Sequence, residues 1–166
     1  MLTVRDAEAA DWPAMWRFMQ PIVAAGETFS WDRDTTEEDA RRGWLHSSRG
    51  ATLVAVAAET GQVVGTAVVQ ANHGGPAGHM GTASFMVDPR HWGRGAGRAL
   101  CEAAIARARR EGFRAMQFNA VAETNTRAVA LWRSLGFRIL ATVPEGFRHP
   151  THGFVGLHIM HRSLLD

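Results

Sequence analysis

The chain has 166 residues, 46% of them hydrophobic and 20% charged, with a formal net charge of +2. These values predict one globular domain over residues 1–166, and the small charge with evenly spread arginines argues against a nucleic-acid partner. No apolar run approaches the roughly 18 residues of a membrane helix, and a lone cysteine with no leader pattern predicts a reduced, cytoplasmic protein without membrane contact.

Apolar periodicity and turn residues divide the chain into strands and helices. The expected elements in chain order are a strand 2–7, a helix capped by Asp11 and reaching Val23, a loop 26–34, a helix from Thr35 to about Ser47, strands 51–58 and 63–70, a glycine-rich connection 71–78, a strand 79–87, a helix 97–111, a strand 114–121, a helix 125–135, and strands 137–143 and 154–161. This order predicts an α/β fold, with a mixed, twisted sheet of about seven strands and four helices on its two faces.

A glycine-rich segment between the strand 79–87 and the helix 97–111 has the composition of a phosphate-binding loop. It reads Gly93-Arg-Gly-Ala-Gly97, and glycines let successive backbone amides approach an anion. The helix that follows adds about half a positive charge at its N-terminus. The chain contains no lysine, which excludes a Walker-type loop, and the spacing differs from the dinucleotide fingerprint. The segment predicts a pyrophosphate site, the alternative being a flexible glycine turn.

Two motifs give the chain a resemblance to a known family. The hexapeptides that begin at Arg90 and at Trp92 are similar to Gln/Arg-x-x-Gly-x-Gly/Ala, the pyrophosphate motif of the Gcn5-related N-acetyltransferases (GNAT family), although tryptophan departs from the pattern in the second. The segment from Asn125 to Phe137 resembles the family's Asn-x-x-Ala-x-x-Leu-Tyr-x-x-x-Gly-Phe helix. The resemblance covers about residues 80–140 and implies the GNAT fold, a splayed strand pair and acetyl-CoA as the acyl donor, with no metal.

The implied coenzyme site combines the end of the strand 79–87, the glycine loop and the Asn125 helix. In this family a backbone amide of the strand before the loop holds the oxyanion, at a bulge that separates that strand from the next one. Here that amide would lie in residues 85–87. The implied coenzyme-binding residues are Phe85, Met86, Val87, Trp92, Gly93, Arg94, Gly95, Ala96, Gly97, Arg98, Asn125 and Trp132.

The resemblance also indicates which residues could act as the acid and the base of the reaction. The family often uses a tyrosine as the acid, but this chain has no tyrosine and Trp132 stands at that position. Candidate bases are Glu27, His79, Glu123 and His152, or a water chain held by Thr82, Ser84 and Asn119, which we favour. The residues expected to act in catalysis are Thr82, Asn119 and Asn125, and those expected to bind substrate are Glu27, Phe29, Trp31, Thr82, Ser84, Asn119 and His152.

Several of these residues also have ordinary structural explanations. Asn125 is equally suited to cap its helix, and Asn119 to bond the backbone from within a strand. Phe29 and Trp31 could pack in the core, and Cys101 is expected to do so. The C-terminal histidines are unsuitable as a metal site because no cysteine or carboxylate joins them.

The segments 26–29, 118–125 and 146–149 further resemble acetyltransferases of proline analogues and of phosphinothricin. This resemblance implies direct acetyl transfer, in a ternary complex, to the amine of a small molecule that is an amino acid or an amino-acid-like toxin. The alternatives are a non-catalytic acyl-CoA-binding regulatory module and a protein N-acetyltransferase. A homodimer formed through the final strands is a further expectation from the family.

Overall fold

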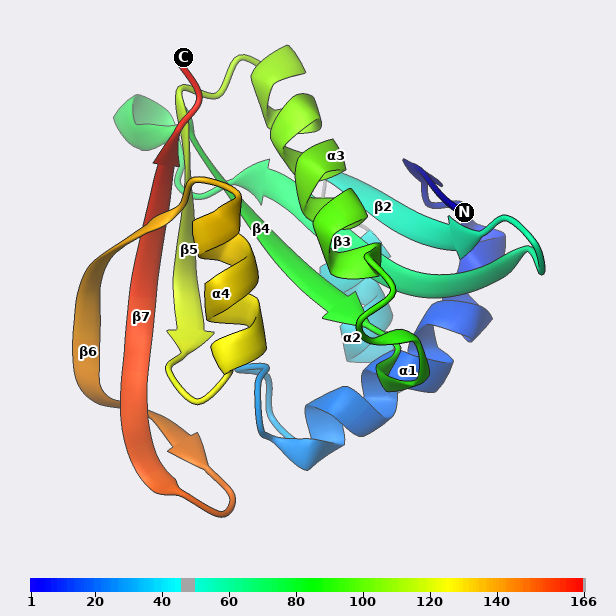
Figure 1. Cartoon of the computed structure of the whole chain (residues 1–166), viewed down its shortest axis with the longest axis horizontal. Coiled ribbons are helices and arrows are strands. Elements are labelled where there is room, and N and C mark those ends of the chain that lie inside the picture. The colour runs from blue at the N-terminus through cyan, green and yellow to red at the C-terminus, as the bar shows by residue number, and fades with distance from the viewer. Residues whose placement is uncertain (46–49, 166) are drawn as a thin grey trace.

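The computed structural model describes residues 1–45 and 50–165, which form one sheet in the order β1-β2-β3-β4-β5-β7-β6 (Figure 1). The strands are β1 (Leu2–Asp6), β2 (Gly50–Ala57), β3 (Gln62–Ala71), β4 (Met80–Val87), β5 (Ala115–Ala122), β6 (Arg138–His149) and β7 (Gly153–Ser163). The α-helices are α1 (Trp12–Ala25), α2 (Glu37–Leu45), α3 (Ala96–Arg110) and α4 (Thr126–Ser134), and short 3-10 turns cover 9–11, 75–77 and 89–91. Among the strands of the described residues, only β4 and β5 pair in parallel, so the expected mixed sheet with four helices is confirmed.

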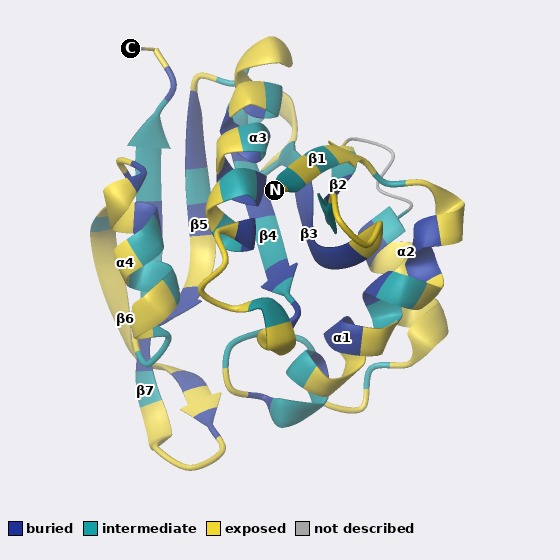
Figure 2. Ribbon diagram, turned by 45° about the vertical axis from the view of Figure 1, so that its right-hand side comes forward, coloured by how far each residue is buried: buried dark blue, intermediate teal, exposed yellow. Residues whose placement is uncertain are grey.

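Helices cover both faces of the sheet, which explains why its central strands are apolar on both sides (Figure 2). Successive side chains of a strand point to opposite faces. On β2, Leu53 packs in the cluster under α3 and α4, whereas Val54 packs in the cluster under α1 and α2. Leu100 of α3 and Trp44 of α2 are the corresponding buried side chains of the two helical layers. Within 1–45 and 50–165, no helix combines the length and apolar character needed to cross a membrane.

The element boundaries differ from the expected ones mainly at the C-terminus. The strands 137–143 and 154–161 are parts of a longer hairpin, in which β6 continues to His149. The register shift between Val143 and Phe147 accommodates the proline and glycine of this segment, and a second shift lies between Ile139 and Ala141. Asp11 precedes α1 as expected, but its carboxylate accepts from Arg5 and from the Glu8 amide rather than capping the helix. The expected end of the second helix, at Ser47, lies outside the described residues.

The sheet opens between β4 and β5. These strands pair only at Met80↔Ala115 and Gly81↔Met116, and they separate beyond that point. The prediction of a bulge in β4, the strand before the loop, is wrong, because β4 keeps one register with β3 along its whole length. The irregularity lies in β5 instead, where pairing with β7 shifts between Phe118 and Val121. The opening therefore arises from the divergence of two strands and not from an extra residue in β4.

Four aromatic rings bridge this opening on the face covered by α4. Phe85 of β4 lies 5.7 Å from Phe118 of β5 and 4.7 Å from Trp132 of α4, measured between ring centroids. Phe118 also contacts Trp132 at 5.2 Å and stacks on Phe137 at 4.2 Å. Side chains thus connect the two strands where backbone hydrogen bonds do not.

Candidate active site

The loop between β4 and α3 is shaped by glycines in the left-handed conformation. Gly93 has φ +75° and Gly95 has φ +86°, and a Cβ at either position would meet no atom within 4 Å. Gly95 directly precedes α3, so the first free amides of that helix face the loop. At Gly97, by contrast, a Cβ would lie 3.1 Å from Leu131, which reflects the close approach of α3 and α4. The loop therefore presents backbone amides to open space in front of a helix N-terminus.

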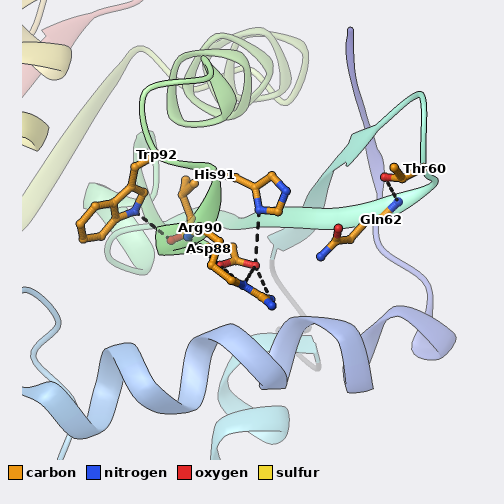
Figure 3. A network of polar contacts seen from close by, with 7 residues as sticks. Thr60, Gln62, Asp88, Arg90, His91 and Trp92 are labelled. Carbon is orange, nitrogen blue, oxygen red and sulfur yellow. Dashed lines mark hydrogen bonds and ion pairs between the residues drawn. The ribbon is translucent and has the colours of Figure 1, made fainter.

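A buried carboxylate fixes the turn that leads into this loop (Figure 3). Asp88 is only 1% exposed, and its carboxylate accepts hydrogen bonds from the backbone N and the Nε and Nη2 atoms of Arg90. His91 Nδ1 lies 3.5 Å from the same carboxylate. Burial alone raises the pKa of Asp88, but the hydrogen bonds and charge of Arg90 outweigh it and hold that pKa below its ordinary value. Trp92 Nε1 donates to the Val87 carbonyl at 3.1 Å, which ties the loop back to β4.

The loop and α4 enclose a groove of about 450 Å³, which we call the loop groove. Its lining residues are Ile22, Thr28, Phe85, Met86, Val87, His91, Trp92, Gly93, Gly95, Ala96, Gly97, Arg98, Thr124, Asn125, Thr126, Arg127, Ala128, Leu131 and Trp132. The ionisable members are His91, Arg98 and Arg127, and no described lining residue is acidic. The Arg127 guanidinium lies 4.5 Å from the centre of the Trp92 ring, so a cation from α4 sits over the loop. The loop groove is suited to an anionic, elongated ligand.

The edge of β4 that faces the opening carries unpaired backbone amides. The Asp88 amide donates to the Val64 carbonyl of β3. In an antiparallel pair every second residue points its amide to the same neighbouring strand, so the amides of Met86 and Ser84 also point to β3. The N–H groups of Phe85 and Val87 therefore point to the opposite side, where β5 has diverged. The His79 carbonyl, which accepts from β5 at the paired end, confirms this alternation. Two backbone donors thus line the opening beside the loop groove.

A second cavity, of about 260 Å³, lies between the diverging strands, and we call it the strand cavity. Its lining residues are Thr28, Phe29, Ser30, Thr82, Ala83, Ser84, Phe85, Phe118, Asn119, Ala120, Val121, Asn125, Ala128 and Trp132. None of these residues carries an ionisable side chain. The strand cavity and the loop groove share five of them, namely Thr28, Phe85, Asn125, Ala128 and Trp132. The two spaces therefore meet at one common wall.

A network of side-chain amides stands at the edge of the strand cavity. Asn119 Oδ1 accepts from Gln117 Nε2 at 3.0 Å and from Asn72 Nδ2 at 3.2 Å, while Asn119 Nδ2 donates to Asn72 Oδ1 at 2.6 Å. Asn119 thus bonds neighbouring side chains rather than backbone. Asn125 Oδ1 accepts from the Ala128 amide at 3.3 Å, which caps α4 as expected, and Asn125 also lines both spaces.

The structure gathers most of the residues singled out from the sequence around these two spaces. Those on the strand cavity are Phe29, Thr82, Ser84, Phe85, Asn119, Asn125 and Trp132. Those on the loop groove are Phe85, Met86, Val87, Trp92, Gly93, Gly95, Ala96, Gly97, Arg98, Asn125 and Trp132. The local glycine and asparagine motifs therefore converge from β4, α3 and α4 on one region.

Other candidates lie outside the lining of both spaces. Glu27 and Arg94 are exposed, and Trp31 packs edge-on against Phe29 and Trp44, at 5.2 and 5.7 Å between ring centroids. His152 lies in the β6–β7 turn, 4.5 Å from the ring of His149.

Further candidates are held elsewhere in the fold. Glu123 accepts from the Gly156 amide at 2.6 Å, on the β7 side of β5, and His79 lies at the end of β4 that is paired with β5. Cys101 is fully buried, and burial raises the pKa of its thiol to about 12, as suits a packing residue. No cluster of three or more metal-ligating side chains occurs among the residues that the structure describes.

Sequence reasoning missed several lining residues. Thr28 and Ser30 flank Phe29 in the same loop, so the prediction for that loop could have included them. His91 and Arg127 lie inside the two recognised motifs, but the family patterns leave those positions open. Asn72 had no signal of its own, because its contact with Asn119 joins residues 47 positions apart.

Comparisons with known proteins agree with this geometry. The acetyltransferase (GNAT) family matches residues 12–137. A GCN5-related N-acetyltransferase from Kribbella flavida is 57% identical, with a TM-score of 0.94 over 98% of this chain and 97% of that one. The structure of yncA from Salmonella typhimurium with its cofactor acetyl-CoA is 27% identical, with a TM-score of 0.85 over 98% and 94%.

A curated relative gives a shorter match. The N-acetyltransferase aca1 of Schizosaccharomyces pombe is 32% identical over 98 residues, which are 58% of this chain and 47% of that protein, so the match spans about half of the relative's length. The family match covers most of this chain and includes α1, the glycine loop and α4. The chain therefore belongs to the acetyltransferase (GNAT) family.

Proposed function

We propose that this protein transfers the acetyl group of acetyl-CoA to the amine of a small molecule, an amino acid or an amino-acid-like compound. The observation that carries the proposal is the shared wall between the loop groove and the strand cavity, where a donor in one space would meet an acceptor in the other. Holding two reactants in contact can supply about 7 to 11 kcal/mol of the barrier. The yncA structure with acetyl-CoA supports the identity of the donor.

The residues of the loop groove fit the coenzyme. Open space at Gly93 and Gly95 gives a diphosphate direct access to loop amides and to the N-terminus of α3. His91, Arg98 and Arg127 add cationic side chains, with no acid in the described lining to oppose them. The Phe85 and Val87 amides would bind the polar groups of an extended arm along β4.

When bound, acetyl-CoA supplies a thioester carbonyl that a neutral amine attacks, and coenzyme A leaves as a thiolate. An N–H group of Phe85 or Val87 would stabilise the negative charge that develops on the carbonyl oxygen, and losing one such fixed donor costs about 3 kcal/mol. Thr82, Ser84 and Asn119 would position water that accepts the amine proton. A free thiol has a pKa of about 8.5, so departure of the thiolate needs little help from an acid. The absence of tyrosine from the chain is therefore compatible with the reaction.

The strand cavity supports a small acceptor. Its volume of about 260 Å³ lies just below the range of about 300 to 1,000 Å³ that is usual for ligand sites, and residues of the loop after α1 form part of its wall. This size suits a compact amine better than a folded protein segment. The chain also exposes Leu140, Val143 and Phe154 on the outer hairpin, which supports a homodimer formed through these strands.

The test is release of coenzyme A thiol from acetyl-CoA with a panel of amines that includes proline analogues, phosphinothricin and an unblocked peptide. The expected result is thiol release with small amines, together with an acetylated product identified by mass spectrometry. Release with the peptide alone would indicate a protein acetyltransferase. Binding of acetyl-CoA without release from any amine would indicate a non-catalytic module.

A further inference from the structure

We propose that the acceptor is a weakly basic amine, with an appreciable neutral fraction at neutral pH and no carboxylate, and that the protein takes this neutral form from solution without a base of its own. The inference rests on the proposed acetyl transfer and narrows the proposed acceptors to amino-acid-like amines, leaving out free amino acids. It comes from the distribution of charge between the two spaces that meet at the shared wall.

Charge is divided sharply between the two spaces. The loop groove carries His91, Arg98 and Arg127, whereas the described lining of the strand cavity has only hydroxyl, amide, aliphatic and aromatic side chains. A buried ammonium or carboxylate needs a counter-charge, or it is strongly disfavoured relative to water. Part of the lining of the strand cavity, such as Asn119, is exposed, so a charged acceptor would keep some of its water there. No counter-charge would replace the hydration that it loses against buried residues such as Phe118 and Val121.

The four ionisable residues considered as bases, Glu27, His79, Glu123 and His152, lie outside the lining of the strand cavity. Both backbone and side chain of Glu123 bond Gly156 on β7, and β7 lies on the side of β5 opposite to β4. His79 lies at the paired end of β4, and Glu27 and His152 are exposed outside the lining. An amine in the strand cavity would therefore meet none of these four side chains in the cavity wall.

The aromatic walls do not substitute for a counter-charge. Phe85, Phe118 and Trp132 contact one another at 4.7 to 5.7 Å between ring centroids. They pack as a cluster rather than as a cage around an open centre. An ammonium ion would therefore gain little from the faces of these rings.

The amide network favours a neutral polar acceptor. Asn119 Oδ1 already accepts from Gln117 and Asn72, and one of its two N–H groups donates to Asn72. The remaining N–H of Asn119 is available to donate to a carbonyl oxygen of the acceptor. Thr82 and Ser84 hydroxyls can accept from a neutral amine. An amine beside a neutral carbonyl, as in an amino-acid amide, matches these donors and acceptors.

The experiment compares alaninamide, alanine and 2-aminobutane, which share one branched skeleton, with saturating acetyl-CoA. The ratio kcat/KM is measured from about pH 6 to about pH 10 for each. An α-amino group beside a neutral carbonyl has a pKa near 8 and an alkylamine near 10.4, so the neutral fractions at pH 7 differ on the order of 10²-fold. We expect alaninamide to be preferred by at least that factor, and each profile to inflect at the pKa of its own amine.

Two variants sharpen the test. Glu123→Gln keeps an acceptor for the Gly156 amide but removes the charge, and it should leave the inflections unchanged. Thr82→Asp places a carboxylate in the strand cavity that can accept the amine proton. The kcat/KM profiles of alaninamide and 2-aminobutane should then share one inflection, at a lower pH than in the unaltered protein.

Four results would overturn the inference. In the unaltered protein these are one inflection shared by alaninamide and 2-aminobutane, turnover of alanine at or above that of alaninamide, and turnover confined to charged amines. The fourth is loss of the inflection in Glu123→Gln, because it would identify Glu123 as a base. Absence of thiol release with every amine would instead refute the proposed function, so the two failures are distinguishable.

Discussion

Replacing Gly95 by glutamate tests whether the glycine loop holds a diphosphate. Gly95 has φ +86° and open space at its Cβ, so the new side chain would occupy the space in front of the α3 N-terminus. A carboxylate about 5 Å from one phosphate charge, at an effective dielectric constant of about 20, opposes binding by about 3 kcal/mol. This energy corresponds to a loss of coenzyme affinity on the order of 10²-fold.

Gly61 provides a matched control for this variant. It lies in the β2–β3 turn with φ +68°, and its Cβ position is equally open, so Gly61→Glu suffers comparable backbone strain of about 1 to 2 kcal/mol away from the site. Isothermal titration with coenzyme A should show the loss in Gly95→Glu alone, and high salt should reduce it. Equal affinity in the two variants would refute the assignment of the loop.

Three further predictions concern stability and reactivity. Because the pKa of Asp88 is lowered, its contribution to stability is present above a pH of about 4 and is lost as the pH falls through its folded-state pKa. In Asp88→Asn, the free energy of unfolding measured over a pH series should therefore decrease less steeply at acid pH. Cys101 should resist iodoacetamide in the folded protein at neutral pH and react fully in denaturant, and rapid labelling of folded protein would contradict its burial. Thr66→Val removes both bonds of the Thr66 hydroxyl, which accepts from Trp44 Nε1 and donates to the Leu53 carbonyl. It should lower the free energy of unfolding by about 1 to 3 kcal/mol, whereas an unchanged urea midpoint would show that these bonds contribute nothing.

Local signals in the sequence were sufficient for the loop and the helices. The glycines at 93 and 95 leave the loop open in front of α3, and Asn125 caps α4 as its position before an amphipathic segment predicted. These features depend on a few consecutive residues, so no knowledge of the rest of the fold is needed to find them. The GNAT resemblance drawn from the same segments is confirmed by the family match.

Features that depend on distant contacts were less accessible. The β6–β7 hairpin runs through residues 144–149 because register shifts accommodate its proline and glycine, which local reasoning treats as strand breakers. The opening of the sheet required knowing where pairing of β4 with β5 stops. Asn72 joins the candidate site only through the fold. A cytoplasmic location, a dimer and the roles of individual site residues stay predictions, since they depend on partners and reactions.

The ring cluster of Phe85, Phe118, Trp132 and Phe137 has a consequence for the mechanics of the protein. Two residue pairs join β4 to β5, and these rings, together with the contact between α3 and α4 at Gly97 and Leu131, pack the half β1–β4 against the half β5–β7. The volume of the rings at positions 85, 118 and 132 therefore affects both the distance between β4 and β5 and the packing between the two halves of the sheet. Changes there would alter the dimensions available to both ligands at once, even though the sheet registers stay the same.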